Sequence, residues 1–310
     1  MMEIYRTDDR ILHQLEEIED GAWIMLTNPT VEELQQIATT FDMDITDVRA
    51  ALDDEESSRI DLEDGYTVIL VDIPTTEIRH EAKAYATIPL GILLTQNHII
   101  TVCTEETPIL NYFIERRVKD FSTKKKMRFV YQILFRTSAL YQSTLRIIDK
   151  KRTEIEENLD SKTEDKELIE LHELESTLVY FATSLRANGV VLDRLSRYKR
   201  LEQFPEDMEL LEDVIVENKQ AVEMTAIYRD IIDGTRELFS SVLNNRLSNV
   251  MKYLTSITVI MAIPTIVSGF FGMNVDLPGA NLHSAFSLIC LGTLIVCVVV
   301  LLLLRKKRMI

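Results

Sequence analysis

The residues best suited to ion chemistry lie near the C-terminus, where an uncharged run ends in Gly272, Met273 and Asn274, with Asp276 two positions later. Several copies of the tripeptide around one axis would form a ring of Gly272 carbonyl and Asn274 amide oxygens without net charge. A small divalent cation such as Mg²⁺ gives up its water reluctantly, and such a ring can hydrogen-bond the hydrated ion without trapping it. We expect Met273 to serve packing and Asp276 to attract cations just outside the ring.

The tripeptide ends the first of two uncharged segments that have about the length a bilayer requires, residues 253–271 and 285–304. The loop between them, 275–284, has no Lys or Arg, whereas basic residues flank the other ends of both segments: Arg246, Lys252 and residues 305–308. The positive-inside rule therefore predicts both termini in the cytoplasm and the loop outside. We expect a multi-pass protein of the plasma (inner) membrane.

The first segment is more polar than the second and contains Pro264. On a helix, small, hydroxyl and flexible apolar residues of this segment and of the turns just before it form one face, which we name the pore face: Ser248, Met251, Leu254, Thr258, Ala262, Thr265 and Gly269. We predict that this face lines a pore and that Met251 and Leu254 form a hydrophobic gate. The alternative is helix–helix packing, where small and hydroxyl residues are also common. Since two segments cannot enclose a pathway, a pore requires several copies of the chain.

Pro264 has a further consequence for the first segment. A proline inside a helix cannot donate to the carbonyl four residues earlier, which here belongs to Ile260. Inside a bilayer that carbonyl requires another partner.

The preceding residues predict an α+β protein with a soluble region. Runs rich in Val, Ile and aromatic residues predict strands at 22–26, 66–73 and 99–103, and Thr30 with Glu33 has the spacing of a helix capping box. From Lys124 the chain has almost no Gly or Pro, which favours two long antiparallel helices turning near 160–163 and a third from Pro205 into the first membrane segment. We expect three parts: an α/β domain (1–123), a long-helix region (124–252) and a membrane domain (253–310).

Composition and motifs exclude several classes of function. A net charge of −16 disfavours nucleic-acid binding. The sequence lacks GxxxxGK[ST], so we expect no bound nucleotide. Its five histidines form no HExxH motif, no nucleophile elbow is present, and its three cysteines are far from CxxC spacing. We expect no enzymatic activity.

The stretch NVMKYLTSITVIMAIPTIVSGFFGMN resembles CorA-type magnesium transporters, which carry Gly-Met-Asn at the end of the first of two C-terminal spans. The resemblance extends along nearly the whole chain. It implies a homopentamer in which five long helices form a cytoplasmic funnel and continue as the pore wall. It also implies inward movement of hydrated Mg²⁺, often with Co²⁺ or Ni²⁺, driven by the membrane potential, with Gly272, Met273 and Asn274 as the selectivity filter.

The resemblance further implies that cytosolic Mg²⁺ regulates transport by binding carboxylates between neighbouring subunits. By position these are Glu77 and Asp213, with Asp72, Glu212 and Glu217 as nearby alternatives. Ser248 departs from the family pattern, which often has Asn at the inner mouth of the pore.

Two other functions compete with Mg²⁺ transport. One is a transporter of the same architecture for Zn²⁺, Co²⁺ or Ni²⁺, since a zinc-exporting branch shares this build. The other is a membrane-anchored coiled-coil scaffold that conducts nothing. The scaffold leaves the polarity difference between the two segments, and the Gly-Met-Asn end, unexplained.

Overall fold

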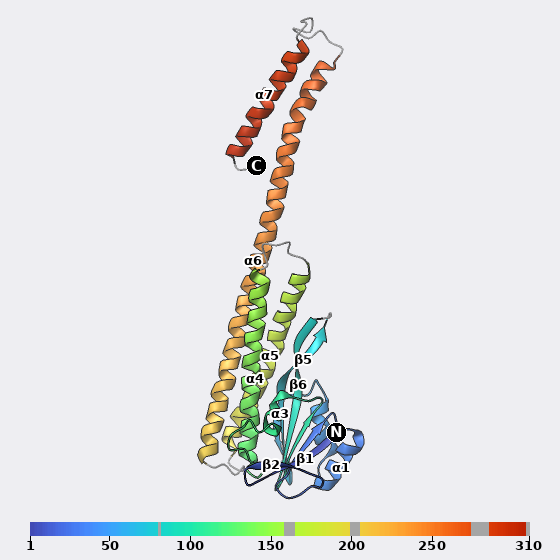
Figure 1. Ribbon diagram of the computed structural model, residues 1–310, viewed down its shortest axis with the longest axis vertical. Helices are drawn as coiled ribbons and strands as arrows, with labels where there is room; N and C mark the ends of the chain where they lie inside the picture. Colours follow the sequence, from blue (N-terminus) through green and yellow to red (C-terminus); the bar gives the residue numbers. More distant parts are fainter. Residues whose placement is uncertain (80–81, 158–164, 199–204, 274–284, 308–310) are drawn as a thin grey trace. The chain divides into compact units, whose positions relative to one another are not determined.

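The structure is a computed structural model that describes residues 1–79, 82–157, 165–198, 205–273 and 285–307. The chain divides into two compact units, Met1–Gly234 and Thr235–Ile310. Its elements, drawn in Figure 1, follow in the order β1 (Met2–Asp8), β2 (Ile11–Leu15), β3 (Trp23–Thr27), α1 (Val31–Phe41), α2 (Ile45–Arg49), η1 (Ala50–Leu52), β4 (Arg59–Leu62), β5 (Tyr66–Arg79), β6 (Ala82–Thr95), β7 (Ile99–Cys103), α3 (Pro108–Ile114), α4 (Lys126–Glu157), α5 (Asp165–Arg197), α6 (Pro205–Phe271) and α7 (Ala285–Lys306).

The strands form one mixed sheet in the described residues, in the order β2-β1-β3-β7-β6-β5-β4. Neighbouring strands are antiparallel except β3 and β7, which pair in parallel from Trp23 and Ile99. Successive side chains point to opposite faces of a strand. Trp23 and Met25 accordingly belong to one hydrophobic core and Ile24 to the other.

Both faces of the sheet are covered, which explains why the predicted strands read as continuous apolar runs. The short helices α1, α2 and η1 cover one face, and α3, α4 and α5 cover the other. Thr30 and Glu33 form the predicted capping box at the start of α1. The layers approach closely at Gly91 of β6, where an added Cβ would lie 2.8 Å from the Cβ of Ala51 in η1.

One buried side chain completes the hydrogen bonds of β5 where β4 no longer accompanies it. The β4–β5 register stops at Arg59 and Leu70, so Asp72 lies beyond the paired segment. Asn188 of α5 replaces the missing strand: its Oδ1 accepts from the Asp72 amide at 2.9 Å and its Nδ2 donates to the Asp72 carbonyl at 2.8 Å. The Asn188 amide thereby joins the long-helix layer to the sheet.

Replacing Asn188 with alanine should destabilise the first unit by about 2 kcal/mol, because the Asp72 amide loses its partner in a buried site. The midpoint of thermal unfolding should fall by roughly 4 to 8 °C. Fluorescence of Trp23, the only tryptophan, measures this because the side chain is fully buried in the sheet core. The control is Asn97→Ala, whose side chain bonds Asp20 at the surface. Equal midpoints for the two variants would contradict the assigned role.

The predicted long helices are confirmed as α4, α5 and α6, and their predicted turn at 160–163 lies outside the described residues. In Figure 1, α4, α5 and the N-terminal part of α6 run side by side within the first unit. Side chains join them: Gln142 of α4 donates to the Glu217 carbonyl of α6 at 3.1 Å, and Asn218 of α6 donates to the Leu185 carbonyl of α5 at 3.1 Å. The scarcity of Gly and Pro in these segments favours such lengths.

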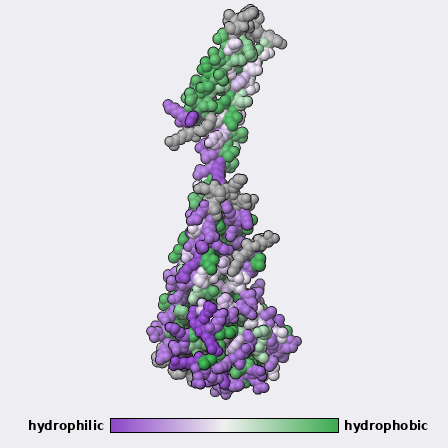
Figure 2. Space-filling view, in the orientation of Figure 1, coloured by the Kyte–Doolittle hydropathy of each residue, from purple (hydrophilic) through white to green (hydrophobic). Residues whose placement is uncertain are grey.

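The second unit contains the end of α6 and the whole of α7, which run beside each other. Both helices are long and apolar enough to cross a membrane, judged by length and composition. Figure 2 shows a hydrophobic surface over α7 and the adjoining turns of α6. The predicted first segment is confirmed as the continuation of α6, which remains one helix through Pro264.

Candidate ion pathway

The predicted filter begins where α6 ends. The Gly272 amide still donates to the Ser268 carbonyl at 2.9 Å, and the Met273 amide closes a tighter turn on Phe270 at 3.3 Å. The φ angle of Gly272 is not positive, but a Cβ at this position would lie only 3.2 Å from the Ser268 carbonyl. Glycine thus permits the last turn to tighten. Asn274 and Asp276 lie outside the described residues.

Within the second unit, α7 covers one side of α6 only. The less exposed residues of α6 recur with helical spacing at Ser256, Ile260, Ile263 and Val267, and those of α7 do so at Ile289, Thr293, Cys297, Val300 and Leu304. At 100° per residue, the α6 stripe points away from the pore face by about half a turn. All seven pore-face residues are exposed in the single chain. The pore face is therefore the side of α6 that α7 leaves open.

The two threonines of the pore face present oxygen acceptors outward. Thr258 donates its hydroxyl to the Leu254 carbonyl at 2.8 Å, and Thr265 donates to the Met261 carbonyl at 3.0 Å. Each hydroxyl proton is thus used within the helix, so the remaining lone pairs face away from it. A hydrated cation, whose waters are donors, would find acceptors at both positions.

Met251 and Leu254 lie on the same open side, two turns and one turn before Thr258. Their side chains are 53% and 58% exposed in the single chain. Large apolar side chains at such exposure require a partner, another copy of the chain or lipid. Their arrangement is compatible with the predicted hydrophobic gate.

The carbonyl that Pro264 leaves unpaired has a partner in α7. The thiol of Cys297 donates to the Ile260 carbonyl at 3.8 Å. This contact supplies the hydrogen-bond partner that the sequence predicted for the Ile260 carbonyl, although the sequence alone did not identify Cys297 as that partner. The second segment contains four small residues that could donate to this carbonyl: Ser287, Cys290, Thr293 and Cys297. Only the register between α6 and α7 shows that Cys297 is the donor.

Removing the thiol should weaken the packing of α7 on α6 slightly, by about 0.6 kcal/mol, the average for a hydrogen bond between membrane helices. Cys297→Ser keeps a donor and should match or exceed the wild-type stability, whereas Cys297→Val should lower it. The measurement is the midpoint of thermal unfolding in detergent micelles. Cys290→Val is the matched control, because Cys290 is exposed. A Val variant at 297 as stable as its Ser counterpart would argue against the bond.

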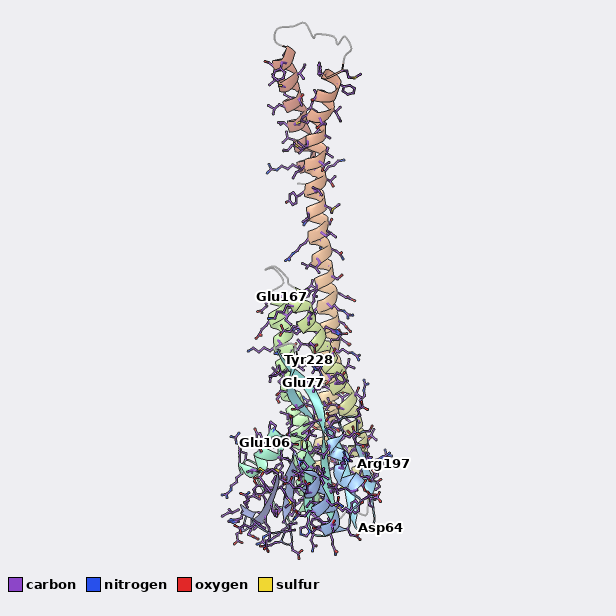
Figure 3. All side chains as sticks on the ribbon, turned by 90° about the vertical axis from the view of Figure 1, so that its right-hand side faces the viewer. Asp64, Glu77, Glu106, Glu167, Arg197 and Tyr228 are labelled. Atoms are coloured by element: carbon purple, nitrogen blue, oxygen red, sulfur yellow. The ribbon has the colours of Figure 1, made fainter. Side chains whose placement is uncertain are left out.

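The proposed regulatory pair is not brought together within one chain. Glu77, which is labelled in Figure 3, lies in β5 on the long β5–β6 hairpin and forms an ion pair with Arg79. Arg79 also reaches Glu173 of α5 at 3.5 Å. Asp213 is exposed on α6, and within the described residues it forms no ion pair. The resemblance places such a pair across a subunit boundary, which a single chain does not contain.

The nearby alternatives differ in how available their carboxylates are. Burial raises the pKa of Asp72, although the neighbouring hydroxyls of Ser184 and Ser58 partly offset this. Glu217 accepts a hydrogen bond from Gln142 at 2.6 Å. Glu212 is exposed on α6 like Asp213. Asp72 and Glu217 already serve the fold, so Glu212 is the alternative whose carboxylate is most accessible.

Comparisons with known proteins found similarity over most of the chain. The sequence profile of a family described as "CorA-like Mg2+ transporter protein" matches residues 19–306. The chain is similar to the "Cobalt/magnesium transport protein CorA" of Methanocaldococcus jannaschii, with 26% identity over 295 residues that cover 92% of this chain and 90% of the relative.

Solved structures show the same fold. The complete structure of the CorA magnesium transporter from Methanocaldococcus jannaschii superposes with a TM-score of 0.87 at 24% identity, covering 100% of this chain and 99% of that one. The cytoplasmic domain of ZntB from Vibrio parahaemolyticus is more distant, with a TM-score of 0.53 at 12% identity over 76% of this chain and 97% of that one.

The family match begins after β2 and ends at the last residue of α7, so it includes strands β3 to β7 of the sheet, the long helices and both apolar C-terminal helices. The shared region therefore contains most of the first unit and the candidate pathway. The chain belongs to the family of CorA-like Mg²⁺ transporter proteins.

Proposed function

We propose that several copies of this chain form a pore that carries hydrated Mg²⁺ into the cell, with α6 as the pore wall. The observation that carries the proposal is the open side of α6, which presents a continuous small and weakly polar face leading to Gly272 and Met273. Because α7 covers the opposite side, this face is free to meet the same face of other copies. The resemblance to the family supports a homopentamer with α7 in an outer ring.

The chemistry of the pathway favours a strongly hydrated divalent cation. Neutral acceptors at Thr258, Thr265 and the Gly272–Asn274 end can hold an ion through its waters, whereas a carboxylate ring would bind a divalent ion too tightly to conduct. Asp276 would raise the cation concentration at the outer mouth. Co²⁺ and Ni²⁺ have the same charge and are expected as secondary substrates.

The membrane potential supplies the driving force. A divalent cation moving inward across about 100 mV gains ~4.6 kcal/mol, since each charge gains ~2.3 kcal/mol. No nucleotide is required. This direction follows from the proposed topology, in which residues 1–123, the long-helix region 124–252 and both termini lie in the cytoplasm, with residues 253–310 in the plasma (inner) membrane.

The test is uptake into vesicles that contain the purified protein and a Mg²⁺-sensitive dye. Inside-negative potential should accelerate Mg²⁺ uptake, and an inside-positive potential should suppress it. Parallel measurements with Zn²⁺, Co²⁺ and Ni²⁺ distinguish a Mg²⁺ transporter from a transporter of the same architecture for one of these ions. Faster uptake of Zn²⁺ than of Mg²⁺ would make Zn²⁺ the assigned ion. Absence of uptake for every ion, from protein that is assembled, would favour the non-conducting scaffold.

We further propose that cytosolic Mg²⁺ closes the pore by bridging Glu77 of one subunit and Asp213 of the next. Two carboxylates held close repel, and a cation between them relieves that repulsion. Mg²⁺ would then favour the closed state through its better binding to that state. When cytosolic Mg²⁺ falls, loss of the ion would separate the subunits and open the pathway.

The double variant Glu77→Gln with Asp213→Asn should lose protection of the soluble region against protease in millimolar Mg²⁺. The matched control is Glu106→Gln with Asp230→Asn, which removes two exposed carboxylates elsewhere in the first unit (Figure 3 labels Glu106). Limited proteolysis with and without Mg²⁺ measures the difference. If Mg²⁺ protects the double variant as well as the wild type, these two residues are not the sensor, while the transport proposal stands.

A further inference from the structure

Cations of the two membrane helices lie at one depth. The contact between Cys297 and the Ile260 carbonyl fixes the antiparallel register of α6 and α7. Lys252 precedes Ile260 by eight residues and Arg305 follows Cys297 by eight, so both lie about 12 Å from that contact in the same direction. We name the residues at and just beyond this level the basic band: Arg246, Lys252, Arg305, Lys306 and Lys307.

The basic band also lies one hydrocarbon thickness from the outer ends of the helices. Twenty residues separate Lys252 from Gly272 on α6, and twenty separate Ala285 from Arg305 on α7, which is about 30 Å in each helix. That length matches the hydrocarbon core of a typical bilayer. If Gly272 and Ala285 lie at one surface of the core, the basic band lies at the headgroups of the other leaflet.

No carboxylate accompanies the basic band in sequence. From Leu238 to Lys307 the only acidic residue is Asp276, which belongs to the opposite end of the helices. Lys252, Arg305, Lys306 and Lys307 are exposed, and among the residues that the structure describes they form no ion pair. Figure 2 shows the hydrophilic cluster where α7 ends, directly beside its hydrophobic surface. A chain of net charge −16 thus concentrates positive charge at this one membrane level.

We propose that the basic band binds the phosphate headgroups of anionic lipids in preference to zwitterionic lipids. Lys and Arg donate charge-assisted hydrogen bonds to phosphate oxygens. A cation at the surface of an anionic leaflet favours the anionic lipid by roughly fivefold. Cations from both helices lie at one headgroup level, so lipid phosphates at that level can contact either helix. This inference rests on the membrane-spanning role of the two helices and is independent of the transported ion.

The experiment uses a tryptophan reporter beside the basic band. Leu302→Trp places the reporter one turn before Arg305, on an exposed position of α7, and the parent protein supplies the background because its only tryptophan, Trp23, is buried in the sheet. The protein is reconstituted in phosphatidylcholine with phosphatidylglycerol, and either lipid carries brominated acyl chains that quench nearby tryptophan. Brominated phosphatidylglycerol should occupy sites beside the reporter about fivefold more strongly than brominated phosphatidylcholine.

Two controls decide whether the basic band causes the preference. Phe286→Trp reports from the opposite end of α7, where the described residues include no cation, and the two lipids should quench it equally. Changing Arg305, Lys306 and Lys307 to Gln should bring the ratio at Leu302→Trp close to one, as should high salt, which screens surface charge. Two results would overturn the proposal. One is equal quenching of Leu302→Trp by the two brominated lipids when the basic band is unchanged. The other is a preference for phosphatidylglycerol that persists after the triple change to Gln.

Discussion

Replacing Asn274 with alanine is expected to lower Mg²⁺ uptake by at least about tenfold while leaving the assembled protein intact. Each side-chain amide would hydrogen-bond the hydrated ion, and a hydrogen bond to a charged group contributes roughly 1.5–3 kcal/mol. One substitution removes the amide from every subunit of the ring at once. Asn274→Asp should also lower uptake, because a ring of carboxylates would hold a divalent cation too tightly to release it.

The control for this variant is Asn281→Ala, which removes the same chemical group from the loop that follows. Both variants should elute from a sizing column as the wild type does, so that a loss of uptake can be assigned to the filter. Wild-type uptake by a correctly assembled Asn274→Ala protein would refute the pore assignment for the end of α6.

Serine in place of Leu254 or Met251 is expected to raise the ion leak several-fold when cytosolic Mg²⁺ is high. A narrow ring of apolar side chains resists wetting, and this resistance is what holds the closed pathway dry. A hydroxyl at either position hydrogen-bonds water and lowers the cost of filling the constriction. Efflux of Mg²⁺ from loaded vesicles, at matched protein content, measures the leak.

Leu302→Ser is the matched control for the gate, since it makes the same chemical change on the outward side of α7. Its leak should equal that of the wild type. If neither pore-face variant leaks more than this control, the constriction lies elsewhere on α6 and the gate assignment is wrong.

The local structure of this protein could be read from its sequence because local contacts determine it. The apolar runs at 66–73 and 99–103 lie within β5 and β7, and Thr30 with Glu33 caps α1 as expected. Long segments with almost no Gly or Pro became α4, α5 and α6. The two uncharged segments, the periodic pore face and the Gly-Met-Asn end were likewise visible in the order of residues, and they were sufficient to indicate the family.

The tertiary structure decided which groups meet across the chain. The sheet order joins β3 to β7 in parallel, although more than seventy residues separate them. Asn188 hydrogen-bonds the backbone of Asp72, which is 116 positions away in the sequence. Cys297 hydrogen-bonds the Ile260 carbonyl, which is 37 positions away. Periodicity defines the faces of each element, but it does not state which face meets which neighbour or in what register. Those choices depend on the packing of whole elements, so only the structure shows that α7 leaves the pore face open.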